Sequence, residues 1–219
     1  MAKKRVGVLI SGRGSNMAAL IEAAKDKNYP AEIALVLSNR PDAGGLKTAQ
    51  AAGIATEIVD HTTFGKDREA FERALQAALE AHRIELVCLA GFMRLLTPWL
   101  VSRWPQRMLN IHPALLPAFK GLNTHVRALE AGVKTHGATV HFVVPELDSG
   151  PIIAQGAVPV LDGDTPDSLA ARVIKIEHRI YPLALRLVAE GRVHVEAGRC
   201  VVSGGTARDG VLLVTGGDS

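Results

Sequence analysis

The sequence predicts an α/β protein with a mostly parallel central sheet, helices on both faces and an antiparallel C-terminal part. In the first half of the chain, short apolar runs alternate with segments of helical character, which is the order of βαβ units. In the second half, the β-rich runs 136–144 and 152–160 flank the turn-rich segment 145–151, and we expect them to pair antiparallel. With 219 residues, of which 47% are hydrophobic, the chain can bury a full core.

The first hundred residues carry alternating signals for strands and helices. In one expected helix, Phe71, Leu75 and Leu79 recur every four residues and so share a face. Thr97 and Pro98 are typical of the N-cap and the first position of a further helix. The expected strands are 5–10, 33–37, 56–59 and 86–89, and the expected helices are 16–24, 46–52 and 67–82.

A long helix dominates the expected structure of the second half. It begins at Thr165 and ends near Gly191, because apolar residues recur every three or four positions between them. Pro182 lies inside this helix and should kink it. The runs 193–197 and 200–202 are then expected to form a terminal hairpin.

The organisation of the chain is expected to be a single domain, 1–219, because neither a linker nor an internal repeat interrupts the pattern. We divide it into a first half, 1–105, and a second half, 106–202. The glycine-rich tail, 203–219, is expected to be loosely ordered.

Charge and composition exclude several classes of partner. The 25 Lys and Arg residues face 22 Asp and Glu residues, and only 4% of residues are aromatic, so we expect no nucleic-acid partner. A small anionic substrate fits this mild balance. Two cysteines are too few for a disulfide framework, which favours the cytoplasm. No apolar run approaches the ~18 residues of a membrane span, so we expect no membrane association.

The short apolar strand expected at 108–112 delivers two polar side chains. Asn110 and His112 lie two residues apart, so both project to the same side of an extended chain, and Pro113 ends the strand. A carboxamide donor beside an imidazole suits the stabilisation of a developing oxyanion and the transfer of a proton. A single buried His or Asn is more often a hydrogen-bonded core group, but two on one face favour function.

A glycine-containing loop joins the first expected strand to the first expected helix. The backbone N–H groups of Gly12, Gly14, Ser15 and Asn16 can point at a phosphate with the helix dipole behind them. Met17 takes the place of the third glycine of a dinucleotide fingerprint, and the loop has no Gly-Lys-Ser/Thr of a P-loop. NAD and ATP are therefore disfavoured, although a glycine turn at this point is also consistent with plain geometry.

Three further polar residues are candidates for the same site. Asp148, on a tight loop, could approach His112 and hold it protonated, but spacing alone favours an Asx turn before Gly150. His136 and His141 are five apart in an expected strand and so face opposite sides, without Cys or carboxylate at ligand spacing. We therefore expect no metal site, and a structural or substrate-adjacent role for the two histidines.

Taken together, four motifs resemble the phosphoribosylglycinamide formyltransferase family: SGRGSN at 11–16, AGFMR at 90–94, NIHP at 110–113 and LDSGP at 147–151. The resemblance runs in the same order from about residue 5 to about residue 202. NIHP with a later Asp is also typical of other enzymes that use 10-formyltetrahydrofolate, whereas the glycine loop and Glu177-His178 are typical of this family.

The resemblance implies a Rossmann-like formyltransferase fold and a role for specific residues. Its catalytic residues would be Asn110, His112 and Asp148, without a metal. The acceptor-binding residues would be Gly12, Gly14, Ser15 and Asn16, with Glu177 near the substrate amine. The folate-binding residues would be Arg68, Met93, Arg94, Leu95, Leu96 and Asn110.

Purely structural roles remain as alternatives for five of these residues. Arg68 and Glu177 can equally be solvated helix charges, and Met93, Leu95 and Leu96 can be core residues. The sequence also departs from the family pattern: Ala114 stands where Ser is common, Arg13 where Asn is common, and Asn123 where His is common. These departures concern fine substrate contacts and not the implied reaction class.

The activity implied by the resemblance is an enzymatic formyl transfer in purine biosynthesis, from 10-formyltetrahydrofolate to the amine of phosphoribosylglycinamide. Residues 1–105 would bind the phosphate, and residues 106–202 would carry catalysis and folate binding. The expected partners are these small molecules, and the expected state is a monomer or homodimer. A formyltetrahydrofolate hydrolase and a noncatalytic sensor of a phosphorylated ligand remain alternatives, and formylation of methionyl-tRNA is disfavoured without a basic extension.

Overall fold

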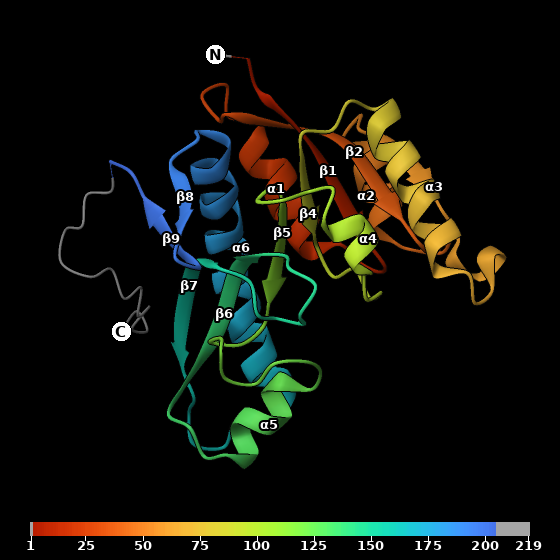
Figure 1. The fold of residues 1–219 in the computed structure, drawn as a ribbon. Helices are drawn as coiled ribbons and strands as arrows, with labels where there is room; N and C mark the ends of the chain where they lie inside the picture. The colour runs from red at the N-terminus through yellow and green to blue at the C-terminus, as the bar shows by residue number, and fades with distance from the viewer. Residues whose placement is uncertain (1, 205–219) are drawn as a thin grey trace.

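A seven-stranded sheet forms the centre of the computed structural model, which describes residues 2–204 (Figure 1). The strand order is β3-β2-β1-β4-β5-β6-β7. Strands β1 to β5 pair parallel, whereas β6 pairs antiparallel with both β5 and β7. The strands are β1 (Lys4–Ile10), β2 (Ala31–Ser38), β3 (Ala55–Ile58), β4 (Leu86–Leu89), β5 (Met108–His112), β6 (Thr135–Phe142) and β7 (Ile152–Pro159).

Helices cover both faces of this sheet, which confirms the predicted fold class. One core lies between the sheet and α1, α2 and α6, and the other lies under α3 and α4. The short helix α5 lies at the bottom of Figure 1 and packs against α6. The helices are α1 (Ser15–Ala24), α2 (Gly45–Ala51), the 3₁₀ turn η1 (His61–Phe64), α3 (Arg68–Ala81), α4 (Pro98–Val101), α5 (Thr124–Glu130) and α6 (Pro166–Ala189).

Strand β1 illustrates why these parallel strands have nearly continuous apolar sequences. Val6, Val8 and Ile10 pack into the core under α1 and α6, whereas Leu9 packs into the core under α3. All four side chains are fully buried, because helices cover the strand on both faces. The central strands therefore lack polar alternation, and their polar residues gather where the strands end.

Helix α6 is the long helix predicted from the apolar periodicity. Its N-cap Thr165 forms a capping box with Ser168, so the first turn is satisfied by side chains. The helix continues through Pro182, whose carbonyl oxygen accepts a hydrogen bond from the Tyr29 hydroxyl at 2.7 Å. The predicted kink at Pro182 stays a prediction. A buried stripe faces the sheet and comprises Leu169, Val173, Ile176, Ile180, Tyr181, Ala184 and Leu185.

The terminal hairpin, α5, α4 and the tail compare differently with the sequence-based prediction. The terminal hairpin is confirmed as β8 (Val193–Glu196) paired antiparallel with β9 (Arg199–Val202). Helix α5 was not predicted. Thr97 is the N-cap of α4 as expected, but its hydroxyl donates to Glu72 instead of capping the helix. The prediction of a loosely ordered tail falls, from residue 205 onward, outside the described residues.

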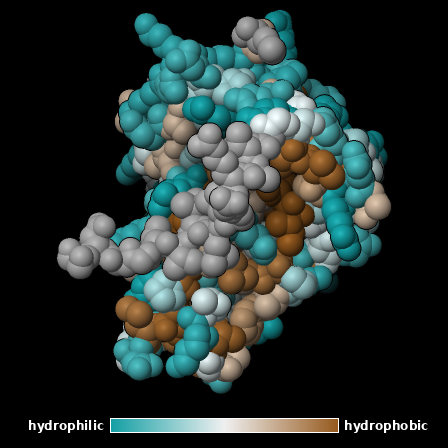
Figure 2. Space-filling view, turned by 90° about the vertical axis from the view of Figure 1, so that its left-hand side faces the viewer, coloured by the Kyte–Doolittle hydropathy of each residue, from teal (hydrophilic) through white to brown (hydrophobic). Residues whose placement is uncertain are grey.

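The surface is mixed in character. In Figure 2, hydrophilic residues dominate the upper part of the visible face, and hydrophobic residues gather across its middle and lower parts. Large exposed hydrophobic side chains include Leu161, Leu183 and Val201, with exposed fractions of 52%, 44% and 42%. Among residues 2–204, no helix has both the length and the hydropathy needed to cross a membrane.

Candidate active site

The candidate site lies where the carboxyl ends of β1, β4 and β5 meet. The chain order reverses at β1, whose neighbours are β2 on one side and β4 on the other. In open α/β sheets, such a switch point leaves a crevice outside the strand ends in which ligands bind. The glycine loop follows β1, the segment 91–97 follows β4, and Asn110 and His112 lie on β5. Three motifs that are far apart in the sequence thus converge at one edge.

The glycine loop forms the start of α1, and its conformation requires glycine at one position. Gly14 is the N-cap residue with a φ of 73°, in the left-handed region. A Cβ there would lie 3.1 Å from the Met17 Cε atom and 3.3 Å from the Gly45 Cα atom. A side chain at Gly14 would therefore strain the backbone and also come too close to Met17 and Gly45. Gly12, by contrast, has open space around it.

Asn16 and Glu177 meet across 161 residues of sequence. The Asn16 Nδ2 atom donates to Glu177 Oε2 at 2.6 Å, which joins α1 to α6. Glu177 is 8% exposed, and burial raises the pKa of its carboxyl, while the hydrogen bond from Asn16 acts in the opposite direction. The interpretation of Glu177 as a solvated helix charge is wrong. The buried Asn16 Oδ1 atom has no partner among the described atoms, which leaves an acceptor at the site.

Asn110 and His112 project to the same side of β5, as predicted from their spacing. Their cross-strand partners on β6 are His141 and Thr139, respectively. The Asn110 Nδ2 atom lies 3.3 Å from His141 Nε2, so the strand pairing adds an imidazole to the site. His112 is buried, with 6% of its surface exposed.

Asp148 lies beside both histidines. Its Oδ2 atom is 3.4 Å from His112 Nδ1, and its Oδ1 atom is 3.8 Å from His141 Nε2. The backbone N–H of Gly121 donates to Asp148 Oδ2 at 2.9 Å. Asp148 is 8% exposed and has a φ of 48°, so the tight loop turns its carboxylate into the site. Its carboxylate therefore bridges separate loops, beyond any role within its own turn.

His112 has a partner at each ring nitrogen. Nδ1 faces the Asp148 carboxylate, and Nε2 lies 3.0 Å from the carbonyl oxygen of Phe119. Because both partners accept hydrogen bonds, an imidazolium satisfies both at once by donating from each nitrogen. The arrangement can therefore hold a cationic donor at the end of β5.

His141 and His136, the two further histidines of β6, occupy separate environments. Burial lowers the pKa of His141, while the Phe142 carbonyl and Asp148 act in the opposite direction. Burial also lowers the pKa of His136 to about 4, and its ring packs against those of Phe119 and His125. Within residues 2–204, no group of three or more His, Cys, Asp or Glu side chains is placed to hold a metal ion.

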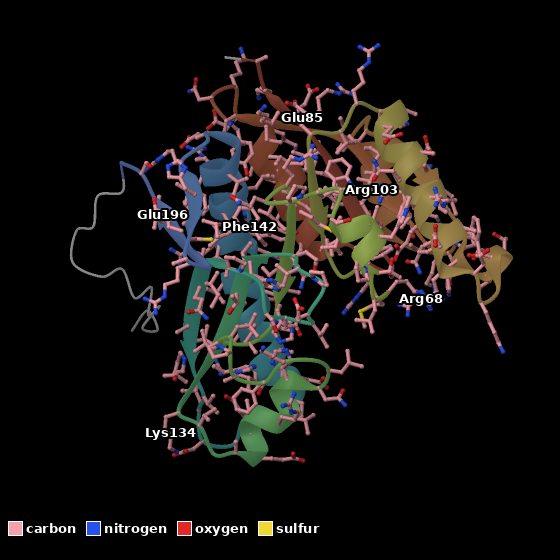
Figure 3. All side chains as sticks on the ribbon, in the orientation of Figure 1. Arg68, Glu85, Arg103, Lys134, Phe142 and Glu196 are labelled. Carbon is pink, nitrogen blue, oxygen red and sulfur yellow. The ribbon has the colours of Figure 1, made fainter. Side chains whose placement is uncertain are left out.

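The proposed folate side is the segment after β4. Met93 and Leu95 are 65% and 62% exposed, so their interpretation as core residues is wrong, whereas Leu96 packs against the core under α3. Arg68 lies at the start of α3 (Figure 3), and its Nη2 atom donates to the Leu95 carbonyl oxygen at 2.6 Å. Arg94 lies half-buried between these two exposed residues.

Sequence reasoning missed one residue near this site, Glu72, and one contact, that of His141 with Asn110. Glu72, on α3, is 1% exposed and accepts hydrogen bonds from the backbone N–H and the hydroxyl of Thr97. Its place next to the core residue Phe71 was the available signal, because a carboxylate there must find partners. His141 was considered, but its contact with Asn110 depends on the strand pairing and was not predicted.

The departures from the family pattern fall at three distinct places. Ala114 is fully buried directly after Pro113. Asn123 is the N-cap of α5 with a φ of 56°, and its side chain makes no capping hydrogen bond. Arg13 is exposed in the glycine loop. None of the three departures replaces Asn110, His112 or Asp148.

Comparison with protein families finds one matching family model. The model, described as "Formyl transferase", matches residues 4–185. Among curated relatives, the phosphoribosylglycinamide formyltransferase of Escherichia coli K12 is 48% identical over 186 residues, which are 85% of this chain and 87% of the relative. The trifunctional purine biosynthetic protein adenosine-3 of Gallus gallus is 52% identical over 90% of this chain. The chain spans only 20% of the length of that larger protein.

Solved structures give the same picture. Glycinamide ribonucleotide transformylase 1 from Symbiobacterium toebii has a TM-score of 0.88 at 48% identity, covering 91% of this chain and 94% of its own. A formyltetrahydrofolate deformylase from Pseudomonas syringae has a TM-score of 0.84 at 31% identity, covering 91% of this chain and 66% of its own. The fold is thus shared by both kinds of protein, and the identity is higher with the transformylase.

Proposed function

Because this chain belongs to the formyl transferase family, we propose that it transfers the formyl group of 10-formyltetrahydrofolate to the amine of phosphoribosylglycinamide in purine biosynthesis. One observation carries this proposal: the group formed by Asn110, His112 and Asp148 lies at the same sheet edge as a glycine loop suited to a phosphate. The first group suits acyl transfer, and the second suits a phosphorylated acceptor.

The reaction begins with attack of the acceptor amine on the formyl carbon. The new C–N bond forms as the carbonyl oxygen becomes an oxyanion, and the bond from the formyl carbon to the folate nitrogen then breaks. One proton moves from the attacking amine to the leaving nitrogen. The Asn110 carboxamide and the His112 imidazolium donate hydrogen bonds to the oxyanion, which stabilises the transition state. The Asp148 carboxylate faces His112 Nδ1, orients the ring and helps to carry the proton.

The contact between His112 and Phe119 matters for this mechanism. The Nε2 atom that would donate to the oxyanion already faces the Phe119 carbonyl oxygen at 3.0 Å. Substrate binding must therefore exchange this carbonyl for the formyl oxygen. The other ring nitrogen, Nδ1, keeps its contact with Asp148, so the orientation of the imidazole is kept during the exchange.

The acceptor binds at the start of α1. The N–H groups after Gly14 and the positive end of the helix dipole receive its phosphate. Glu177 lies one hydrogen bond away, through Asn16, and its carboxylate suits the substrate amine. The exposed apolar side chains of Met93 and Leu95 offer an apolar surface for the pterin of the folate.

We extend the proposal to the organisation of the protein. Residues 1–105 bind the phosphate and supply Arg68 and residues 93–96 of the folate side. Residues 106–202 carry catalysis and supply Asn110 to the folate site, within a single domain. The protein works on small molecules in the cytoplasm as a monomer or homodimer, without a metal. Supporting this, the low cysteine content is typical of proteins in a reducing compartment.

A hydrolase that sends water to the formyl group is the second candidate, because it would use the same three side chains. The deformylase from Pseudomonas syringae shares the fold, but at 31% identity it is less similar than the transformylase at 48%. The phosphate-binding character of the glycine loop favours the transferase, since water needs no phosphate site.

The decisive experiment is incubation of the protein with 10-formyltetrahydrofolate, with and without phosphoribosylglycinamide. We expect release of tetrahydrofolate to depend on the phosphorylated amine and to be matched by formylated product, because the amine is the nucleophile. Equal release in the absence of the amine would contradict the transferase and favour the hydrolase. Absence of release in both arms would contradict both candidates and leave the sensor.

A further inference from the structure

We propose that Ser11 is a positioning residue that couples the acceptor-phosphate loop to the folate-side segment, so that the two substrates bind cooperatively. The inference rests on the proposed function, because it takes residues 12–16 and 93–96 as the two binding segments. Ser11 itself belongs to neither group of implied binding residues. It lies between them, at the carboxyl end of β1.

The Ser11 hydroxyl connects three strand ends. Its Oγ atom accepts a hydrogen bond from the backbone N–H of Met93 at 2.8 Å and donates to Asn39 Oδ1 at 2.5 Å. The backbone N–H of Ser11 donates to the Gly91 carbonyl oxygen at 3.2 Å. The residues after β1, β2 and β4 are thus joined through one side chain.

The orientation of this hydroxyl is fixed by its partners. A hydroxyl has a single proton to donate, and Ser11 donates it to Asn39, so its lone pairs point toward Met93. Asn39 is 1% exposed, and its backbone carbonyl oxygen accepts a hydrogen bond from the backbone N–H of His61 at 3.3 Å. Its side-chain Nδ2 atom lies 3.2 Å from His61 Nδ1, so the side chain is held as well. The acceptor for the Ser11 proton is therefore itself held in place.

The segment 91–97 has different anchors at its other end. Arg68 donates to the Leu95 carbonyl oxygen, and Glu72 accepts from Thr97. Both of these anchors come from α3, which does not contribute to the glycine loop. Ser11, in contrast, is covalently continuous with Gly12. Any shift of the glycine loop on phosphate binding is therefore transmitted to Met93 through Ser11.

The expected result of this link is reciprocal binding. If one substrate fixes Ser11, the segment that binds the other substrate is already ordered. Each substrate therefore raises the affinity for the other by the same factor. We expect a factor of about 5 or more, at the lower end of the range for coupled sites. A serine with a purely structural role would lower stability without changing this factor.

The test uses tetrahydrofolate and phosphoribosylglycinamide, which cannot react with each other. Calorimetric titration of tetrahydrofolate, with and without saturating phosphoribosylglycinamide, gives the coupling factor directly. In Ser11→Ala, we expect weaker tetrahydrofolate binding by about 5-fold, as for one lost hydrogen bond, and a coupling factor near 1. Ser11→Cys, which keeps the size but bonds weakly, should behave in the same way if Ser11→Ala folds poorly.

Thr97→Val is the matched control. It removes a hydroxyl that anchors the far end of the same segment, through Glu72, without touching the glycine loop. We expect weaker tetrahydrofolate binding with an unchanged coupling factor. A full coupling factor in folded Ser11→Ala and Ser11→Cys, or a wild-type factor of 1, would overturn the inference. Wild-type protein that binds neither ligand would instead overturn the proposed function.

Discussion

The two halves of the sheet contribute to the candidate site in different ways. In the parallel half, the contribution comes from a backbone loop after β1, in which Gly14 adopts a φ that side chains rarely tolerate. In the half that contains the antiparallel β5–β6 pair, it comes from side chains: Asn110 and His112 on β5, with His141 opposite Asn110 on β6. The first region depends on the shape of the main chain, and the second on charge and hydrogen-bonding groups.

This difference predicts different kinetic effects in the two halves. A change of charge in the antiparallel half should lower kcat, because it acts on the transition state. A change of backbone shape in the parallel half should raise the KM of the acceptor, because it acts on binding. The following variants test this division, beginning with the largest effect.

Asp148→Asn should have the largest effect. It deletes the charge that faces His112, while its carbonyl oxygen can still accept from the Gly121 N–H. We expect kcat to fall roughly 10²- to 10⁴-fold, as for loss of a positioned acid–base group, with modest changes in KM. Steady-state kinetics on the folded variant provide the measurement.

The control for this variant is Asp162→Asn, which removes the same charge from a fully exposed side chain. We expect its kcat to match that of the wild type. If Asp148→Asn also kept a near-wild-type kcat, Asp148 would be a turn residue and the catalytic assignment would be wrong.

Gly14→Val should chiefly affect the acceptor. The added side chain meets Met17 and the Gly45 backbone and obstructs the approach of the phosphate. We expect the KM of phosphoribosylglycinamide to rise roughly 10- to 100-fold, which corresponds to a lost hydrogen bond to a charged group. Gly53→Val is the matched control, since Gly53 has the same φ of 73° in open space. An unchanged acceptor KM in folded Gly14→Val would remove the phosphate cradle from the proposal.

Glu177→Gln should have a smaller, pH-dependent effect. Because burial raises the pKa of Glu177, its carboxylate takes up a proton at a higher pH than an ordinary carboxyl. Wild-type acceptor affinity should fall as the pH drops through this raised pKa, and Glu177→Gln should lack that inflection. Binding titrations between pH 4 and pH 8 provide the measurement, and Glu22→Gln on the exposed face of α1 is the control. The same inflection in Glu177→Gln would assign it to another group.

Glu177→Gln should also increase the stability of the folded protein, although it removes a carboxylate that we propose for acceptor binding. A carboxyl whose pKa is raised in the folded state favours folding when protonated and costs stability as the pH rises through the folded pKa. Glu177→Gln should therefore slightly raise the free energy of unfolding at neutral pH. The gain should vanish below the pKa of an ordinary glutamate. Urea denaturation at two pH values checks this, and a loss of stability at neutral pH would contradict it.

The strands and the long helix could be predicted because their patterns are local. Each buried parallel strand is a β-rich apolar run, and α6 repeats apolar residues over 24 positions. Helix α5 has only seven residues, of which Thr124 and Ala128 are buried, so it has no apolar periodicity to detect. Its N-cap Asn123 has a positive φ and no side-chain cap, so the usual start signal is also absent.

The candidate site was only partly predictable, for a related reason. The spacing of Asn110 and His112 places them on one face, because side chains alternate along a strand. The contacts of Asp148 with His112 and Gly121 join loops that are 27 or more residues apart, and no local pattern encodes them. The contact of His141 with Asn110 likewise depends on the antiparallel pairing of β6 with β5, which joins residues that are 31 positions apart.

Helix α6 has a consequence for how the protein moves. It packs against α1 in the first half and against β6 and β7 in the second half, with its apolar stripe fully buried. In Figure 1 it runs alongside the sheet past both regions. A hinge motion between the halves would have to separate these contacts. The crevice therefore cannot open and close by rigid-body movement of one half against the other. Substrates must instead enter and leave by local motions of the loops around it, on the faster timescale of loop rearrangement.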